Sequence, residues 1–392
     1  MGVKCNKAIT RSEITRGFRV SENLLLAVGG YNMDTLERYE KIDIPFYKEK
    51  IAPFLPKKIL DFHTHSWKYE HWIQHEVKSN LGINNSTALG TLKSARYMVT
   101  EVEYGVEKLQ EDGRRMFPDK EYYAVVFGNP TPMCNLELTN MYISNVGSAK
   151  NLFPLMVVRK NMYSKDDLKS KIIEGGFFGY KVFLPWVGND YGNIKVEDMI
   201  GSTELEVAEE LGLVVILHVP GAQRLANPEV QDVVVRYANM YPNVNIVLAH
   251  CGRCYGYEEM KASINSIKYT ENIYLDTSMV MDPIVLEIVF DNIDSKRVLY
   301  GTDLPVAAMR GRRVFVMDHW VDVVLEGYPE SDFRVASNTI RATFMTWEIA
   351  LAVRIAGEMA GLSNKEISCI FYDNGIKLLK NVRGGYLLRK KL

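Results

Sequence analysis

The sequence is poor in the features that mark secreted, membrane-spanning or nucleic-acid-binding proteins. Its 392 residues include only five cysteines, an odd and scattered set that predicts free thiols rather than a disulfide framework. Lysine plus arginine number 47 and aspartate plus glutamate 48, so no field favours nucleic acid or an acidic membrane. Apolar runs such as residues 213–217 are too short to cross a bilayer, and the charged residues 1–20 lack the apolar core of a signal peptide. We therefore expect a cytoplasmic protein with a small-molecule substrate.

Eight short runs of β-branched and aromatic residues recur along the chain, and most precede a segment with helical periodicity. Strands that alternate with helices predict parallel pairing, because a parallel pair needs a long crossover connection. Eight such units favour a closed (β/α)8 barrel, the TIM-barrel fold, over an open sheet. The predicted strands are 58–62, 122–127, 153–158, 179–184, 213–217, 245–249, 272–275 and 297–300.

The remaining segments predict additions to one barrel domain. Residues 1–57 are interpreted as an N-terminal helical extension and residues 58–392 as the barrel domain with C-terminal helices. The loop after the first strand is long and aromatic, and on the catalytic face of a barrel it would be a lid or a substrate wall. These additions make a homodimer plausible. Predicted helices are 164–174, 196–211, 228–241, 257–269, 339–359 and 364–380.

Polar side chains stand where several predicted strands end. His63 and His65 are two residues apart, so both imidazoles point to the same side of the first strand. His218 closes the fifth strand, His250 closes the sixth, and Asp303 follows the eighth. Active sites of (β/α)8 barrels are built at the carboxyl ends of the strands. The sequence therefore predicts that these five side chains meet.

Their chemistry fits a catalytic metal site. A single histidine at a strand end is more often a structural residue than a ligand, and an isolated H-x-H pair is weak evidence. The recurrence of such residues at four strand ends favours a shared metal site over four separate structural residues. Neutral imidazole and carboxylate are the usual donors to zinc-like ions, and a water bound in the open position has its pKa lowered towards ~7.

The ordered motifs resemble those of the amidohydrolase superfamily, in particular the amidohydrolase 2 branch related to aminocarboxymuconate semialdehyde decarboxylase. The resemblance runs from about residue 58 to residue 379 and includes a closing helix at residues 362–374. It is carried by Asp-Phe-His-Thr-His at 61–65, Leu-His at 217–218, Leu-Ala-His-Cys-Gly at 248–252 and Tyr-Gly-Thr-Asp-Leu-Pro at 300–305.

This resemblance implies one divalent metal held by His63, His65, His218 and Asp303. Zinc is the first expectation, with manganese, iron or cobalt as alternatives. His250 would either lie outside the ligand set or ligate weakly, and would orient water or polarise the substrate, and Asp303 would also move protons. Other branches carry a carboxylated lysine on the fourth strand, where Lys181 stands, but we expect a single metal here.

Five side chains are predicted to contact the substrate. Arg253 and Arg310 follow the sixth and eighth strands, where a guanidinium can hold a carboxylate through two parallel hydrogen bonds. The set is Lys181, Arg253, Arg310, Trp186 and Trp67. We interpret His71 and His75 as solvent- or substrate-facing, His319 as a structural residue of a helix, and the Cys251/Cys254 pair as chance.

Three functions remain open from the sequence. The first is a hydrolase that attacks an ester, lactone or amide carbonyl with a metal-activated water, while Asp303 relays the proton. The second is a non-oxidative decarboxylase of a small aromatic or unsaturated acid, in which Asp303 or His250 protonates the carbon that loses CO₂. The third is a metal-binding barrel without catalysis, which the unfavourable burial of so many polar donors opposes. We favour the hydrolase because it is the broader activity of the superfamily.

Overall fold

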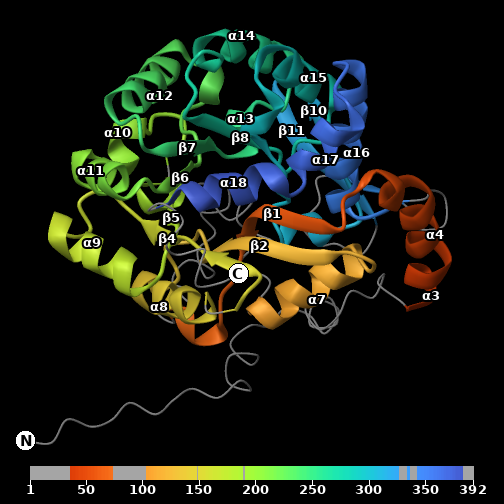
Figure 1. The fold of residues 1–392 in the computed structure, drawn as a ribbon, viewed down its shortest axis with the longest axis horizontal. Coiled ribbons are helices and arrows are strands. Elements are labelled where there is room, and N and C mark those ends of the chain that lie inside the picture. Colours follow the sequence, from red (N-terminus) through yellow and green to blue (C-terminus); the bar gives the residue numbers. More distant parts are fainter. Residues whose placement is uncertain are drawn as a thin grey trace, which may run out of the picture.

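The computed structural model describes residues 36–73, 103–147, 149–188, 190–325, 333–335 and 342–382. Two parallel sheets form its centre, and helices surround them (Figure 1). In the first sheet the strand order is β1 (Lys58–His65), β2 (Glu121–Phe127) and β3 (Leu152–Pro154). The second sheet runs in chain order through β4 (Met156–Val158), β5 (Gly179–Val182), β6 (Val214–Leu217), β7 (Asn245–Leu248), β8 (Ile273–Asp276) and β9 (Val298–Leu299).

All eight predicted strand regions are therefore strands, and their pairing is parallel. Most of their side chains are buried because helices cover the outer face and other strand residues fill the centre. At Gly179 an added Cβ would lie 1.8 Å from the carbonyl oxygen of Val214, so only glycine allows β5 and β6 to approach this closely.

Backbone hydrogen bonds also connect the two sheets at both of their edges. Leu155, between β3 and β4, donates to the Val126 carbonyl of β2 at 2.9 Å. At the other edge Phe62 of β1 donates to the Tyr300 carbonyl at 2.8 Å, and Asp303 donates back to the His63 carbonyl at 2.9 Å. The sheets are thus joined on both sides at the level where the predicted site residues stand.

The helices that follow the strands lie on the outside of the sheets (Figure 1). Side-chain caps mark where several begin: Ser164 accepts a hydrogen bond from the backbone of Asp167, and Asn227 caps a helix that opens with a proline. The predicted helix 196–211 is two helices that break at Ile200 and Gly201. The outer helices are α7 (Val106–Met116), α8 (Leu136–Val146), α9 (Lys165–Glu174), α10 (Val196–Met199), α11 (Ser202–Leu211), α12 (Pro228–Met240), α14 (Tyr257–Ile267) and α15 (Pro283–Asn292).

Residues 36–54 form a run of short helical turns, from α3 (Leu36–Arg38) through α4 (Ile44–Phe46) to a 3-10 turn at Ala52–Phe54. The run packs on the C-terminal helix α16 (Met345–Met359), where Phe46 stacks on Trp347 with ring centroids 5.9 Å apart. The part of the predicted N-terminal extension that precedes residue 36 lies outside the described residues.

After β9 the chain departs from the prediction. His319, expected in a helix, lies on a strand: β10 (Gly311–Val316) and β11 (His319–Leu325) form an antiparallel hairpin, and β12 (Phe333–Val335) pairs with β11. Alternating valines and aromatic residues favour strand here. The last predicted helix is also two, α17 (Asn364–Ile370) and α18 (Asp373–Asn381). In the described part of the chain no helix is long and apolar enough to cross a membrane.

Candidate metal centre

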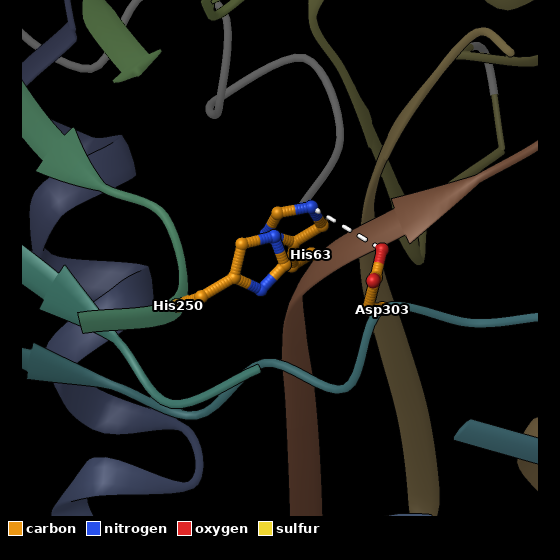
Figure 2. Close-up of side chains that lie close together, drawn as sticks. All are labelled: His63, His250 and Asp303. Carbon is orange, nitrogen blue, oxygen red and sulfur yellow. Dashed lines mark ion pairs between the residues drawn. The ribbon is translucent and has the colours of Figure 1, made fainter. Parts of the chain in front are cut away.

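The structure brings the five predicted side chains to the carboxyl ends of the parallel strands. His63 and His65 project from the end of β1, and His218, His250 and Asp303 follow β6, β7 and β9. His63, His250 and Asp303 each offer one ligand atom, and these atoms lie within 4.8 Å of one another. Figure 2 shows the His63 and His250 rings side by side, with Nε2 of His63 3.5 Å from a carboxylate oxygen of Asp303. This trio forms a candidate metal centre.

The hydrogen bonds of the imidazoles determine which nitrogen can act as a ligand. Nδ1 of His63 donates to the Asp276 carboxylate at 2.9 Å. Nδ1 of His65 donates to the Gly128 carbonyl at 3.0 Å, and Nδ1 of His250 to the Ser278 carbonyl at 3.1 Å. A neutral ring whose Nδ1 carries the proton has its lone pair on Nε2. The three rings therefore present Nε2 lone pairs.

These lone pairs face the Asp303 carboxylate. Nε2 of His65 lies 3.0 Å from Asp303, so two acceptors approach each other. Burial raises the pKa of Asp303, whereas an N–H donated by His65 and positive charge close to the carboxylate lower it. With neutral rings that turn their lone pairs to the carboxylate, a bound cation would supply this positive charge. Burial lowers the pKa of His250 to about 3, so this ring is neutral. A cation between these groups removes their mutual repulsion, so the donor set fits a divalent metal.

The trio contains His250, which was expected either outside the ligand set or as a weak ligand, so its position favours the second alternative. His65 contacts Asp303, and His218 lies beside His250 at a centroid distance of 5.3 Å. Burial lowers the pKa of His218 well below its usual value, and its Nδ1 is buried without a hydrogen-bond partner among the described residues. His65 and His218 thus remain predicted ligands that adjoin the trio.

A left-handed turn brings His250 into the trio. Residues His250 to Arg253 all have positive φ, between 49° and 71°, and Asp303 has φ of 74°. Such a conformation costs roughly 1–2 kcal/mol for each residue other than glycine. Surrounding contacts hold it: the backbone N–H of His250 donates to Asp276 at 2.9 Å, and the thiol of Cys251 donates to the Asp276 carbonyl at 3.3 Å. Strain of this kind is concentrated at functional sites.

Two buried carboxylates that the sequence analysis did not assign hold the candidate metal centre in place. Asp276 ends β8 and binds both His63 and the backbone of His250, and metal-binding histidines commonly have such an outer partner. Asp61 accepts hydrogen bonds from the Thr302 backbone at 2.9 Å and from the Tyr122 hydroxyl at 2.9 Å, so it connects β1 to the residue before Asp303. The signal for both was present, because each is an aspartate near a strand end.

Lys181 lies next to the trio. Its side chain is fully buried on β5, and Nζ lies 3.2 Å from Nε2 of His63. The rings of Phe127 and Phe183 lie 5.0 and 4.9 Å from the ammonium. Burial lowers the pKa of Lys181 to about 8, although Asp276 and Asp303 oppose this shift. Its predicted contact with substrate stays a prediction, as does the single metal.

Of the remaining predicted substrate residues, Arg253, Trp186 and Trp67 keep their predicted role untested, whereas Arg310 has a structural partner. Arg253 lies in the left-handed turn. Trp186 ends a 3-10 turn after β5, and its indole N–H is buried without a hydrogen-bond partner among the described residues. Trp67 is fully buried against Tyr104. Arg310 is also fully buried, and its guanidinium forms an ion pair with Asp43 and covers the ring of Phe344. Arg310 is therefore better explained as a structural cation than as a substrate ligand.

The cysteines and the other histidines of the described residues do not belong to the trio. His71 is buried and accepts a hydrogen bond from the backbone of Lys68 at 3.1 Å, so it does not face solvent, and the alternative that it faces substrate stays a prediction. His75 lies outside the described residues. Burial raises the pKa of both the Cys251 and the Cys254 thiols, which makes them poor nucleophiles.

Comparison with known proteins supports the same conclusion as the site. The family model described as amidohydrolase matches residues 154–380, more than half of the chain and including His218, His250 and Asp303. No protein of curated function matches the sequence significantly.

Solved structures share the fold at low sequence identity. A 4-oxalomesaconate hydratase from Rhodopseudomonas palustris is 15% identical with a TM-score of 0.53, and the alignment covers 85% of this chain and 99% of that one. A 5-carboxyvanillate decarboxylase from Sphingomonas paucimobilis is 11% identical with a TM-score of 0.52, over 83% and 99% of the two chains. Together with the family match and the donor set, these findings identify the chain as a member of the amidohydrolase family of metal-dependent enzymes.

Proposed function

We propose that this protein is a metal-dependent hydrolase that acts on a small, carboxylate-bearing molecule. The observation that carries the proposal is the convergence of the His63 and His250 rings with the Asp303 carboxylate at the strand ends. His63, His250 and Asp303 would hold the metal, with His65 and His218 as adjoining donors. A bound divalent metal, zinc in the first instance and manganese, iron or cobalt otherwise, would polarise a substrate carbonyl and lower the pKa of a water towards ~7.

The residues of this chain supply the remaining functions. Asp303 is the carboxylate placed to take up and return a proton. Its side chain is 15% exposed, whereas those of His63 and His65 are nearly inaccessible to solvent. Asp276 and the Ser278 carbonyl hold the His63 and His250 rings in one tautomer. The aromatic rings around Lys181 keep water away from the inner side of the site, which strengthens electrostatic interactions there.

We also infer that the two parallel sheets make one closed (β/α)8 barrel. The hydrogen bonds from Leu155 to Val126 and from Phe62 to Tyr300 support closure at the two edges. Nearer the start of β1, residues between α17 and α18 take the place of direct pairing between β1 and β9. The backbone N–H groups of Leu60 and Tyr300 donate to the carbonyls of Phe371 and Ile370. This insertion accounts for the missing strand pairing between β1 and β9, while the other interruption lies at Leu155 between β3 and β4. The division into an extension at residues 1–57 and a barrel at 58–392 stays a proposal.

A decarboxylase is the second candidate, and the surroundings of Lys181 favour it. A carboxylate bound beside a buried ammonium and between Phe127 and Phe183 would lose its hydration, and loss of CO₂ disperses that charge. The structurally similar decarboxylase makes this reaction a direct comparison for the assay. Asp303 would then protonate the carbon in place of activating water.

Elemental analysis of the purified and reconstituted protein tests both candidates first. We expect about one metal per chain, with a clear loss in His63→Ala and no change in His319→Ala, whose ring is exposed on β11. Two metals per chain would indicate a carboxylated Lys181, and none after reconstitution would reject the proposed function. Metal-loaded enzyme is then offered esters and lactones, with acid release measured, and aromatic carboxylates, with CO₂ release measured.

A further inference from the structure

The Nδ1 sides of the His63 and His250 rings meet at one serine. Ser278 follows β8, and its side chain is fully buried. Its hydroxyl oxygen lies 3.1 Å from Nδ1 of His63 and 2.8 Å from Nδ1 of His250, and the hydroxyl also donates to the carboxylate of Asp276. One hydroxyl group therefore contacts both rings of the trio and the carboxylate that holds them.

The Asp276 carboxylate determines the direction of these hydrogen bonds. One of its oxygens accepts from the backbone N–H groups of His250 and Ser278, at 2.9 and 3.1 Å, and from the Ser278 hydroxyl. The other oxygen accepts from Nδ1 of His63 at 2.9 Å. Four donors thus surround a carboxylate, which in its ionised form has no hydrogen of its own to donate. The single hydrogen of the Ser278 hydroxyl is therefore used by Asp276.

The Ser278 oxygen is left to accept hydrogen bonds from the two rings. A hydroxyl group has one hydrogen and two lone pairs, so both lone pairs remain for Nδ1 of His63 and Nδ1 of His250. An Nδ1 without hydrogen would place two lone pairs against each other in a fully buried position, which is unfavourable. Both rings are thus held with the proton on Nδ1, and both present the Nε2 lone pair to a metal.

Each ring also has a second acceptor, so the role of the serine is to couple the rings to each other. The Nδ1 proton of His63 is shared between Ser278 and Asp276, and that of His250 between the hydroxyl and the backbone carbonyl of Ser278. The ring centroids lie 4.8 Å apart, with 34° between the ring planes. Because both rings bind one oxygen atom, a displacement of either ring weakens a hydrogen bond at that atom.

We propose that Ser278 is a positioning residue that joins the His63 and His250 rings into one unit, with both protons on Nδ1, and that it acts through Asp276. A metal needs lone pairs that converge, and a pair of rings that is already fixed loses less conformational freedom when the metal binds. This inference rests on the proposed function and adds to it the residue that sets the two imidazoles relative to each other.

Nitrogen NMR of the metal-free, full-length protein with isotopically labelled histidine tests the proton positions. The chemical shift of a ring nitrogen distinguishes a protonated atom from one with a lone pair, and the signals are assigned by their loss in His63→Gln and His250→Gln. We expect Nδ1 to carry the proton in both rings. A lone pair on Nδ1 of either ring would mean that Ser278 donates to that ring, and it would overturn the inference.

Zinc affinity, measured by competition with a chromogenic chelator, tests whether Ser278 acts through Asp276. Ser278→Ala should bind zinc about tenfold more weakly than the wild type, which is the lower end of the usual effect because the second acceptors remain. In an Asp276→Asn background the same substitution should weaken binding less than about twofold, since residues of one network are not additive. An unchanged affinity in Ser278→Ala, or an equal loss in both backgrounds, rejects the proposed role.

Ser263→Ala is the matched control, because Ser263 is also fully buried and its hydroxyl donates to the Glu259 carbonyl within α14 at 2.6 Å. It should bind zinc as the wild type does. A tenfold loss in Ser263→Ala as well would assign the effect to the loss of any buried hydroxyl and reject the role of Ser278. The two claims fail separately: a wild type that binds no zinc rejects the proposed function, whereas the proton positions are measured without metal and still decide the inference.

Discussion

The two sides of the candidate site are built differently. On the metal side Asp276, Gly128 and Ser278 accept hydrogen bonds from Nδ1 of His63, His65 and His250, so the protein itself determines the tautomers and orientations of these three rings. On the hairpin side, formed by the left-handed turn and the β10–β11 hairpin, Arg224 and Arg313 form ion pairs with Glu259 and Asp322. The difference shows that the protein turns lone pairs towards the position of a metal and neutralises charge where the hairpin packs.

Asp303→Asn should have the largest effect because it removes the carboxylate of the metal side. The amide keeps the shape but loses both the charge and the ability to take up a proton. We expect turnover to fall by about 10³-fold or more, with weakened metal binding. The measurement is kcat on a compound that the metal-loaded wild type converts, together with metal content. Turnover within tenfold of wild type would remove Asp303 from the reaction.

Arg310→Met sharpens the contrast between the two arginines that the sequence analysis treated alike. It leaves the buried Asp43 without its ion-pair partner, so the free energy of unfolding should fall by about 3–5 kcal/mol. Urea denaturation measures the loss, and Arg312→Met, at an exposed pair, should cost less than about 1 kcal/mol. A stable Arg310→Met protein with impaired turnover of a compound that the wild type converts would restore Arg310 to the substrate site.

Asp276→Asn tests whether the metal side is oriented by its outer partner. The asparagine can still accept from His63 but carries no charge, so the metal dissociation constant should rise about 10- to 100-fold. Competition with a chromogenic chelator measures it. Asp282→Asn, which retains a capping side chain at the start of α15, should bind metal as the wild type does. An unchanged constant in Asp276→Asn would show that strand geometry alone places the His63 ring.

Much of the metal side was predictable because strand ends are local features. A run of apolar residues followed by a histidine or aspartate is visible in the sequence, and parallel strands bring their carboxyl ends together. This reasoning located His63, His65, His218, His250 and Asp303, and the same rule applied to the seventh strand would have added Asp276. It could not assign His250 to the trio, because that depends on a left-handed turn that local preferences disfavour.

The hairpin side was decided by tertiary structure. Sequence order places Arg253 and Arg310 alike, just after strands, yet Arg310 meets Asp43, 267 positions earlier in the chain, and Arg253 meets no carboxylate in the described part. Arg313 and Tyr255 carry no spacing that marks them, and they adjoin because the hairpin folds back on the residues after β7. The sequence by itself determined the repeating strands and the polar residues at their ends, since both follow from local periodicity. The partners of each charge depend on contacts between distant segments, and these only the folded chain decides.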